Sequence, residues 1–182
     1  MSKLADGSHN LAERQSKKSE WYTPQYLLRA PRAYFGGVIP LDPCTSADNP
    51  TAAKRFYTQQ TNGLEQDWSK HSGVFVNPPY GKKFGFHAFI EKINLEAEKG
   101  LPIWALLPCG ARFSTKYWQA HILSEYVKAV CFIDHRVSFE DPPGTAHKSN
   151  LYDSIYYGFN VDPNRFAEAA WDLGRCFSWD LL

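Results

Sequence analysis

The stretch that decides the fold is residues 73–100, GVFVNPPYGKKFGFHAFIEKINLEAEKG. Residues 74–76 form a short run of β-branched and aromatic side chains, which is typical of a buried strand. This strand must stop at Asn77, because the two prolines that follow have no N–H to donate to a sheet. The second half predicts an amphipathic helix that ends at Gly100, with an apolar face made by Phe86, Phe89, Ile90, Ile93 and Ala97.

The alternation of strand and helix continues on both sides of this stretch. We predict strands at 37–44, 55–58, 101–109, 127–134 and 154–160, and helices at 23–31, 114–123 and 164–174. The first helix is expected to have Thr23 as N-cap and Pro24 at its first position, and to end at Pro31. Asp162 or Asn164 should lie near the start of the last helix.

This order of elements predicts an α/β domain with a mostly parallel sheet. The strands at 127–133 and 154–160 are an exception, because the polar segment between them has no apolar helical period. A parallel connection would need such a crossover helix, so we expect these two strands to pair antiparallel at the sheet edge.

The composition is that of one globular domain. The chain has 182 residues, of which 43% are hydrophobic and 15% aromatic. Residues 1–19 are polar and without an apolar period, so we expect a flexible arm there and one domain over 20–182. No apolar run reaches the roughly 20 residues that cross a bilayer, and the start of the chain lacks a signal peptide's apolar stretch. The four cysteines form no CxxC pair, which argues against a zinc site and indicates reduced thiols in the cytoplasm.

Polar groups gather where the predicted strands end, which is where α/β sheets bind ligands. Asp42 follows one strand, and its carboxylate could accept a hydrogen bond from a ligand hydroxyl or amine. Asn77, Pro78, Pro79 and Tyr80 follow another. The prolines are stiff and offer no amide protons, so this corner presents an amide side chain, carbonyl oxygens and an aromatic ring. Such groups suit a planar NH2 group, and a nucleobase with an exocyclic amine fits that description.

The NPPY sequence at 77–80 matches the signature (D/N/S)-P-P-(Y/F/W) of amino-group methyltransferases that use S-adenosylmethionine. A wider set of blocks resembles the phage and prophage family of DNA N6-adenine methyltransferases (Dam-type), in the family's order and over roughly residues 20–160. The blocks are WYTPQYLL, LDPCTSADNP, RFYTQQTNGLEQDW, VFVNPPYGK, LLPCGARFSTKYWQ and IDHRVSFE. The resemblance implies a single-domain Rossmann-like class I methyltransferase that modifies DNA in the cytoplasm of a bacterial host cell and is encoded by a phage or prophage.

The resemblance also implies a role for each matching position. The implied catalytic residues are Asn77, Pro78, Pro79 and Tyr80. The implied S-adenosylmethionine-binding residues are Trp21, Thr23 and Pro24 over the methionine part, Asp42, Pro43 and Cys44 at the cofactor loop, and Asp67 and Trp68 near the adenosine. Chemically, the Asn77 side-chain oxygen and the Pro78 carbonyl would accept both N6 protons of a flipped adenine stacked on Tyr80. This chemistry needs no metal.

The net charge of +1 gives no general attraction to nucleic acid, so DNA contacts must come from a local patch. The candidate DNA-binding residues are Lys82, Lys83, Arg112 and Lys116 near the corner, and Arg136 and Lys148 in the polar segment 134–153. The chain has no spare stretch of about 60 residues for a recognition domain. We therefore expect methylation in a short or relaxed sequence context.

Several alternatives stay open at this point. The planar NH2 that the corner suits also occurs in RNA and in a protein glutamine, and an inactive relative could keep the fold and bind DNA only. Asn77–Tyr80 could be only a strand-ending turn, and Asp42 only a turn former. Asp67 could be a loop residue beside a buried tryptophan. Trp21 and Thr23 could serve as a core aromatic and an N-cap, and the basic residues could be ordinary solvated charges.

Overall fold

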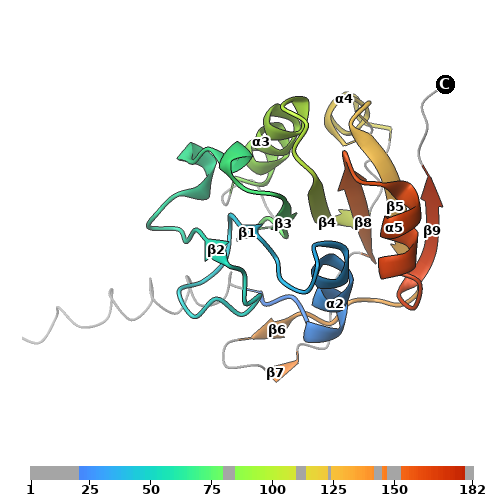
Figure 1. The fold of residues 1–182 in the computed structure, drawn as a ribbon, viewed down its shortest axis with the longest axis horizontal. Coiled ribbons are helices and arrows are strands. Elements are labelled where there is room, and N and C mark those ends of the chain that lie inside the picture. The colour runs from blue at the N-terminus through green and yellow to red at the C-terminus, as the bar shows by residue number, and fades with distance from the viewer. Residues whose placement is uncertain are drawn as a thin grey trace, which may run out of the picture.

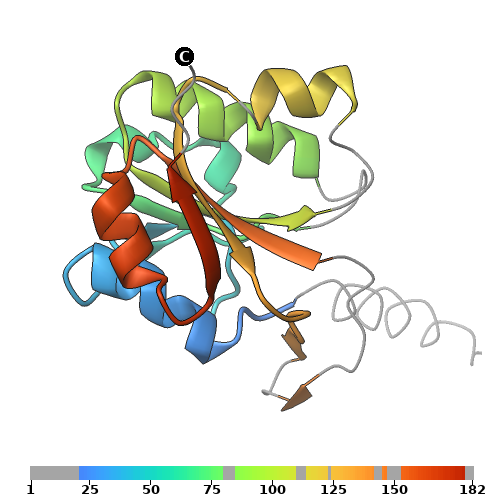
Figure 2. The same cartoon turned by 90° about the vertical axis from the view of Figure 1, so that its right-hand side faces the viewer.

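The computed structural model describes residues 21–79, 85–109, 114–122, 124–141, 145–146 and 153–178. A five-stranded sheet lies between two layers of helices (Figures 1 and 2). Helices α3 (Phe86–Glu98) and α4 (Lys116–His121) cover one face of the sheet. Helices α2 (Gln25–Tyr34) and α5 (Pro163–Ala169) cover the other. The chain is thus an α/β protein.

The five strands run in the order β3 (Val74–Val76), β4 (Ile103–Cys109), β8 (Asp153–Phe159), β5 (Val127–Ile133) and β9 (Gly174–Ser178). Strands β3 and β4 are parallel, and the pairings β4–β8, β8–β5 and β5–β9 are antiparallel. Two small sheets complete the fold: β1 (Leu41–Asp42) pairs parallel with β2 (Arg55–Phe56), and β6 (Glu140–Asp141) pairs antiparallel with β7 (Thr145–Ala146).

The prediction of a mostly parallel sheet is therefore not confirmed for this five-stranded sheet. The predicted antiparallel pairing of β5 with β8 is confirmed, but β8 lies inside the sheet, between β4 and β5, and does not form its edge. Beyond β5 the edge strand is β9, for which the sequence predicted no strand. None of the five residues of this strand is buried, and its sequence lacks the apolar run by which buried strands are recognised.

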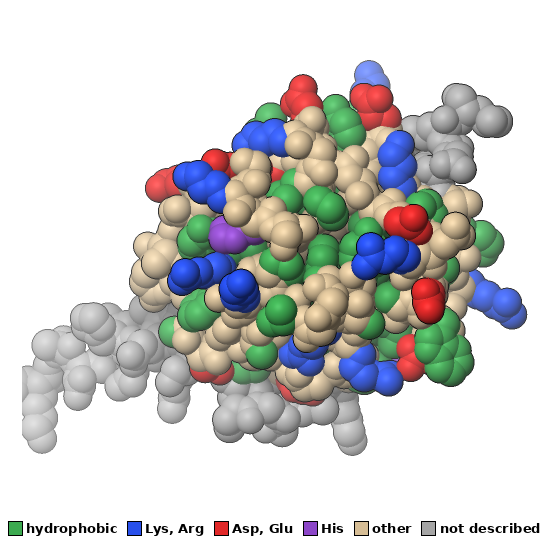
Figure 3. Space-filling view, in the orientation of Figure 1, with side chains coloured by type: hydrophobic (Ala, Val, Ile, Leu, Met, Phe, Trp, Pro, Cys, Tyr) green, Lys and Arg blue, Asp and Glu red, His purple; other side chains and the backbone are tan. Residues whose placement is uncertain are grey.

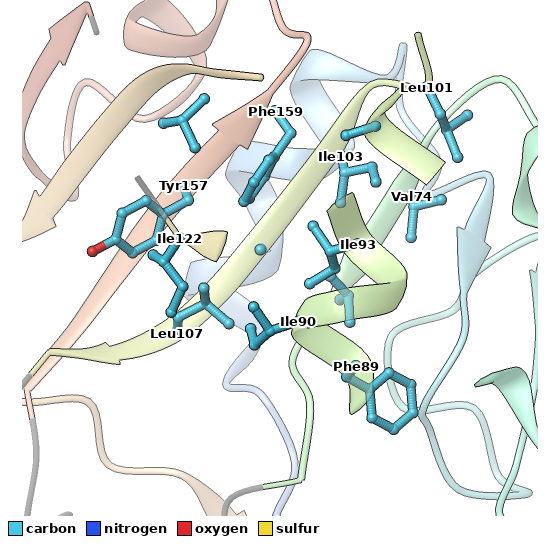
Figure 4. Packing of buried hydrophobic residues seen from close by; sticks show 14 of the residues in the cluster. Val74, Phe89, Ile90, Ile93, Leu101, Ile103, Leu107, Ile122, Tyr157 and Phe159 are labelled. Atoms are coloured by element: carbon cyan, nitrogen blue, oxygen red, sulfur yellow. The ribbon is translucent and has the colours of Figure 1, made fainter. Parts of the chain in front are cut away.

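Successive side chains of β3 point to opposite faces of the sheet, and both faces are buried. Val74 and Val76 point toward α3 and α4, and Phe75 between them points toward α2 and α5. Every residue of the predicted apolar face of α3 is buried (Figure 4). Ile90 and Ile93 are fully buried, and each contributes about 1.5–3 kcal/mol to folding. The helix ends as predicted, with Gly100 at φ +84° just after it.

Helix α2 continues through Pro31 to Tyr34, so the prediction that Pro31 ends it is wrong. A proline inside a helix removes the hydrogen bond to the carbonyl four residues earlier, here that of Leu27. The buried hydroxyl of Tyr156 on β8 donates to this carbonyl at 3.1 Å. A side chain from the sheet thus replaces the missing backbone bond.

Tyr156→Phe is therefore expected to lower the free energy of unfolding by about 1–3 kcal/mol, since it leaves a buried carbonyl without this donor. Urea unfolding followed by circular dichroism measures the change. Tyr126→Phe, at a half-buried tyrosine outside this contact, is the matched control. An equal loss in both variants would mean that Tyr156 does not support α2.

Across the described part of the chain, none of the helices combines the length and the apolar character needed to cross a membrane.

Candidate active site

A cleft of about 590 Å³ opens where β1 and β3 end. These strands lie side by side (Figure 1), and the residues that follow each of them line the same cleft. Eight of the twelve residues predicted as catalytic or cofactor-binding line this cleft: Trp21, Thr23, Asp42, Pro43, Cys44, Asn77, Pro78 and Pro79. The structure thus brings three segments that are distant in the sequence to one cavity.

Asp42 is a buried carboxylate in the wall of the cleft, with 3% of its surface exposed. It accepts hydrogen bonds from the backbone N–H of Cys44 at 3.1 Å and from the hydroxyl of Thr51 at 2.8 Å. Burial raises the pKa of Asp42 to about 6, although these hydrogen bonds act in the opposite direction. A ligand that adds donors to this carboxylate would favour its charged form.

Asn77 is held from two sides. Its side-chain Nδ2 donates to the hydroxyl of Thr23 at 3.0 Å, and its backbone carbonyl accepts from the thiol of Cys44 at 3.3 Å. Burial raises the pKa of the Cys44 thiol well above its usual range, so this group is a neutral donor. Two of the three segments that were predicted to bind the cofactor therefore contact the predicted catalytic corner directly.

Two loops of the cleft wall were not predicted as site residues, and each has a structural reason to be there. Gly63, in the 3-10 turn η1 (Gly63–Glu65), lies so close to Pro43 that a Cβ atom would stand 1.9 Å from the proline carbonyl oxygen. The Asn62–Gly63 pair in the sequence is a typical turn signal, which indicates the turn but not its contact with Pro43. The second loop carries Asp48, whose carboxylate accepts from the Tyr22 hydroxyl at 2.8 and 3.0 Å.

Three predicted cofactor residues do not line the cleft. Trp68 is fully buried beneath it, and its indole N–H donates to the Gly63 carbonyl at 2.8 Å, so it supports the wall from behind. Asp67 accepts from the backbone N–H of Ser69 and caps the 3-10 turn η2 (Trp68–Lys70). The hydroxyl of Ser69 also lowers the pKa of Asp67. Pro24 is the N-cap of α2, a position that the sequence analysis wrongly gave to Thr23.

Of the predicted DNA-binding residues, the structure describes two. Lys116 is exposed in the first turn of α4, and Arg136 is exposed in an ion pair with Asp153 at 3.4 Å. On the face in Figure 3, basic and acidic side chains are interspersed. The other predicted DNA-binding residues lie outside the described residues: Lys82, Lys83, Arg112 and Lys148. The predicted catalytic residue Tyr80 also lies outside them.

Within the ranges that the structure covers, no three His, Cys, Asp or Glu side chains form a group that could hold a metal ion.

The protein is an α/β protein in which an Asn-Pro-Pro corner and a buried carboxylate share one cleft at the ends of two strands. This is the place where α/β sheets commonly hold small-molecule sites. A family model described as DNA N-6-adenine-methyltransferase (Dam) matches residues 10–155, which is most of the chain. The chain therefore belongs to the Dam family of DNA N-6-adenine-methyltransferases, as its resemblance indicated.

A curated relative is similar over a shorter stretch. The chain is 33% identical over 88 residues to the DNA N-6-adenine-methyltransferase of Escherichia phage T1. This match covers 48% of the chain and 35% of the relative's length. The chain thus matches about a third of that protein.

Proposed function

We propose that this protein transfers a methyl group from S-adenosylmethionine to N6 of adenine in DNA. The observation that carries the proposal is the shared cleft, in which the Asn77–Pro79 corner faces the same cavity as Asp42 and Trp21. Family membership supports the reaction and its DNA substrate. The cytoplasm of a phage-infected bacterium is the matching setting.

The cleft suits S-adenosylmethionine in size and chemistry. Its volume of about 590 Å³ lies within the roughly 300–1,000 Å³ of typical small-molecule sites. The Asp42 carboxylate would accept from a hydroxyl or amine of the cofactor, and Pro43, Cys44 and Trp21 would form the surrounding wall. The cofactor supplies the electrophilic methyl group. We assign the fold as a variant of the Rossmann-like class I arrangement, because β1 and β3 each belong to a parallel pair and end at this cleft.

At the corner, the side-chain oxygen of Asn77 and the carbonyl of Pro78 accept hydrogen bonds from the adenine NH2 group. These bonds draw the amine out of conjugation and aim its lone pair at the methyl group, so that orientation lowers the barrier. With the cofactor bound, N6 would form a bond to the methyl group as the methyl–sulfur bond breaks, and N6 would release one of its protons to water. Because a duplex hides N6, the base flips out at a cost of a few kcal/mol and stacks on Tyr80.

The methylation is expected to occur in a short or relaxed sequence context. Phosphate contacts would position DNA without reading its sequence. The basic residues that we propose for these contacts are Lys82, Lys83, Arg112, Lys116, Arg136 and Lys148. Single-molecule sequencing of DNA from an adenine-methylation-deficient host that expresses the protein tests both claims. Modified adenines should fall in many contexts, and they should be far fewer in a strain that expresses Asn77→Ala at the same level.

The same experiment separates the alternatives. A single motif of four or more fixed bases would show that this chain reads sequence closely and would reject the relaxed context. Unmodified DNA, together with label from S-adenosylmethionine in RNA or protein, would move the substrate to those classes. Unmodified DNA without measurable S-adenosylmethionine binding would identify an inactive relative.

A further inference from the structure

We infer that Thr23 is a positioning residue that acts through Asn77, a role that rests on the proposed function. The sequence resemblance assigns Thr23 to the cofactor, and the helix pattern assigns it to the N-cap of α2. The structure leaves the N-cap to Pro24, and α2 has no side-chain cap bond. The Thr23 hydroxyl instead accepts from Nδ2 of Asn77, 54 residues away, at 3.0 Å.

Thr23 is itself held firmly, so it can act as a fixed reference point. Only 4% of its surface is exposed. On one side, Tyr22 and Glu140 exchange both backbone hydrogen bonds, at 2.8 and 3.0 Å. On the other side, the Pro24 carbonyl accepts from Leu27 at 3.0 Å and fixes the start of α2.

The contact matters because the last torsion of an asparagine side chain is only loosely restrained by its own geometry. The Cys44 thiol holds the Asn77 backbone carbonyl, and the Thr23 hydroxyl holds Nδ2 of its carboxamide. In the proposed reaction this carboxamide must direct its oxygen at the amine. A displacement of about 1 Å at such a group can cost on the order of 10²-fold in rate.

The test compares Thr23→Val with Thr23→Ser. Valine keeps the size and removes the hydroxyl, and serine keeps the hydroxyl. Single-turnover methylation of DNA at saturating S-adenosylmethionine should slow by about 10- to 100-fold in Thr23→Val and recover in Thr23→Ser. The affinity for S-adenosylmethionine, measured by calorimetry, should stay unchanged in both variants. Thermal melting checks the folding of each, and Thr23→Ala repeats the measurement if valine prevents folding.

A second measurement asks whether Thr23 acts through Asn77. In an Asn77→Ala background the contact is already lost, so adding Thr23→Val should slow the residual rate no further. An additional loss in that background would overturn the inference. A loss confined to cofactor affinity, with an unchanged rate, would do the same and return Thr23 to cofactor binding. If the wild-type protein does not methylate adenine, the proposed function is wrong, and so is the inference that rests on it. A wild-type rate in Thr23→Val would overturn the inference alone.

Discussion

Asn77→Ala is expected to reduce the rate of methyl transfer by on the order of 10²–10³-fold, the cost typical of removing one hydrogen-bonding group aimed at the reacting atoms. The variant removes the carboxamide that Thr23 orients and leaves the backbone of the Asn-Pro-Pro corner in place. Cofactor affinity should change little, because Asp42 and the other cofactor residues remain. A fall in rate at constant affinity is the signature of a group that acts in the transition state.

Label transfer from S-adenosylmethionine to DNA measures this rate, and calorimetry measures the affinity. Asn164→Ala, the same substitution at an exposed position in α5, is the matched control and should be fully active. If Asn77→Ala keeps more than about a tenth of the wild-type rate, the carboxamide does not direct the amine, and the corner is only a strand-ending turn.

Asp42→Asn is expected to weaken S-adenosylmethionine binding by about 1.5–3 kcal/mol, the worth of a hydrogen bond to a charged group. Asparagine can keep the two internal bonds, because its oxygen can accept from the Cys44 N–H and its NH2 can donate to the Thr51 hydroxyl. The variant therefore tests the charge more than the packing.

The pH dependence of cofactor affinity gives a second test of the role of the Asp42 carboxylate. Because the pKa of Asp42 is raised to about 6, wild-type affinity should fall as the pH drops below that value, while the affinity of Asp42→Asn should not follow this titration. A wild-type affinity that is flat from pH 7.5 to 5, or an undiminished affinity in Asp42→Asn, would show that the carboxylate is structural.

The contribution of Asp42 to folding stability should change with pH in the opposite direction to the cofactor affinity. The folded protein holds the Asp42 proton more tightly than the unfolded chain, whose pKa is near 3.8. This group's contribution to stability is fully present below pH 3.8 and is lost as the pH rises through about 6. Above pH 6, Asp42 thus carries a buried charge that costs stability and that a bound ligand would compensate.

Much of the site was predictable from local sequence. The apolar run at 74–76, the two prolines after it and the helical period from Phe86 to Ala97 each follow from chemistry within a few residues, and all lie where expected. That Asp42 and Asn77 would share one cleft followed from a general rule, because residues after parallel strands meet at one edge. The sequence also indicated the family, through blocks spread along most of the chain.

Other features depended on partners far away in the sequence, and only the tertiary structure decided them. Helix α2 passes through Pro31 because the Tyr156 hydroxyl satisfies the Leu27 carbonyl. Strand β8 enters between β4 and β5, and β9 closes the edge, because sheet order depends on pairing between strands and not on the pattern within each. Thr23 meets Asn77 across 54 residues, and Trp68 supports the cleft through Gly63 without lining it. A hydroxyl or an indole N–H can bond to any acceptor that folding brings within reach, so its partner is set by packing and cannot be deduced from its neighbours in the chain.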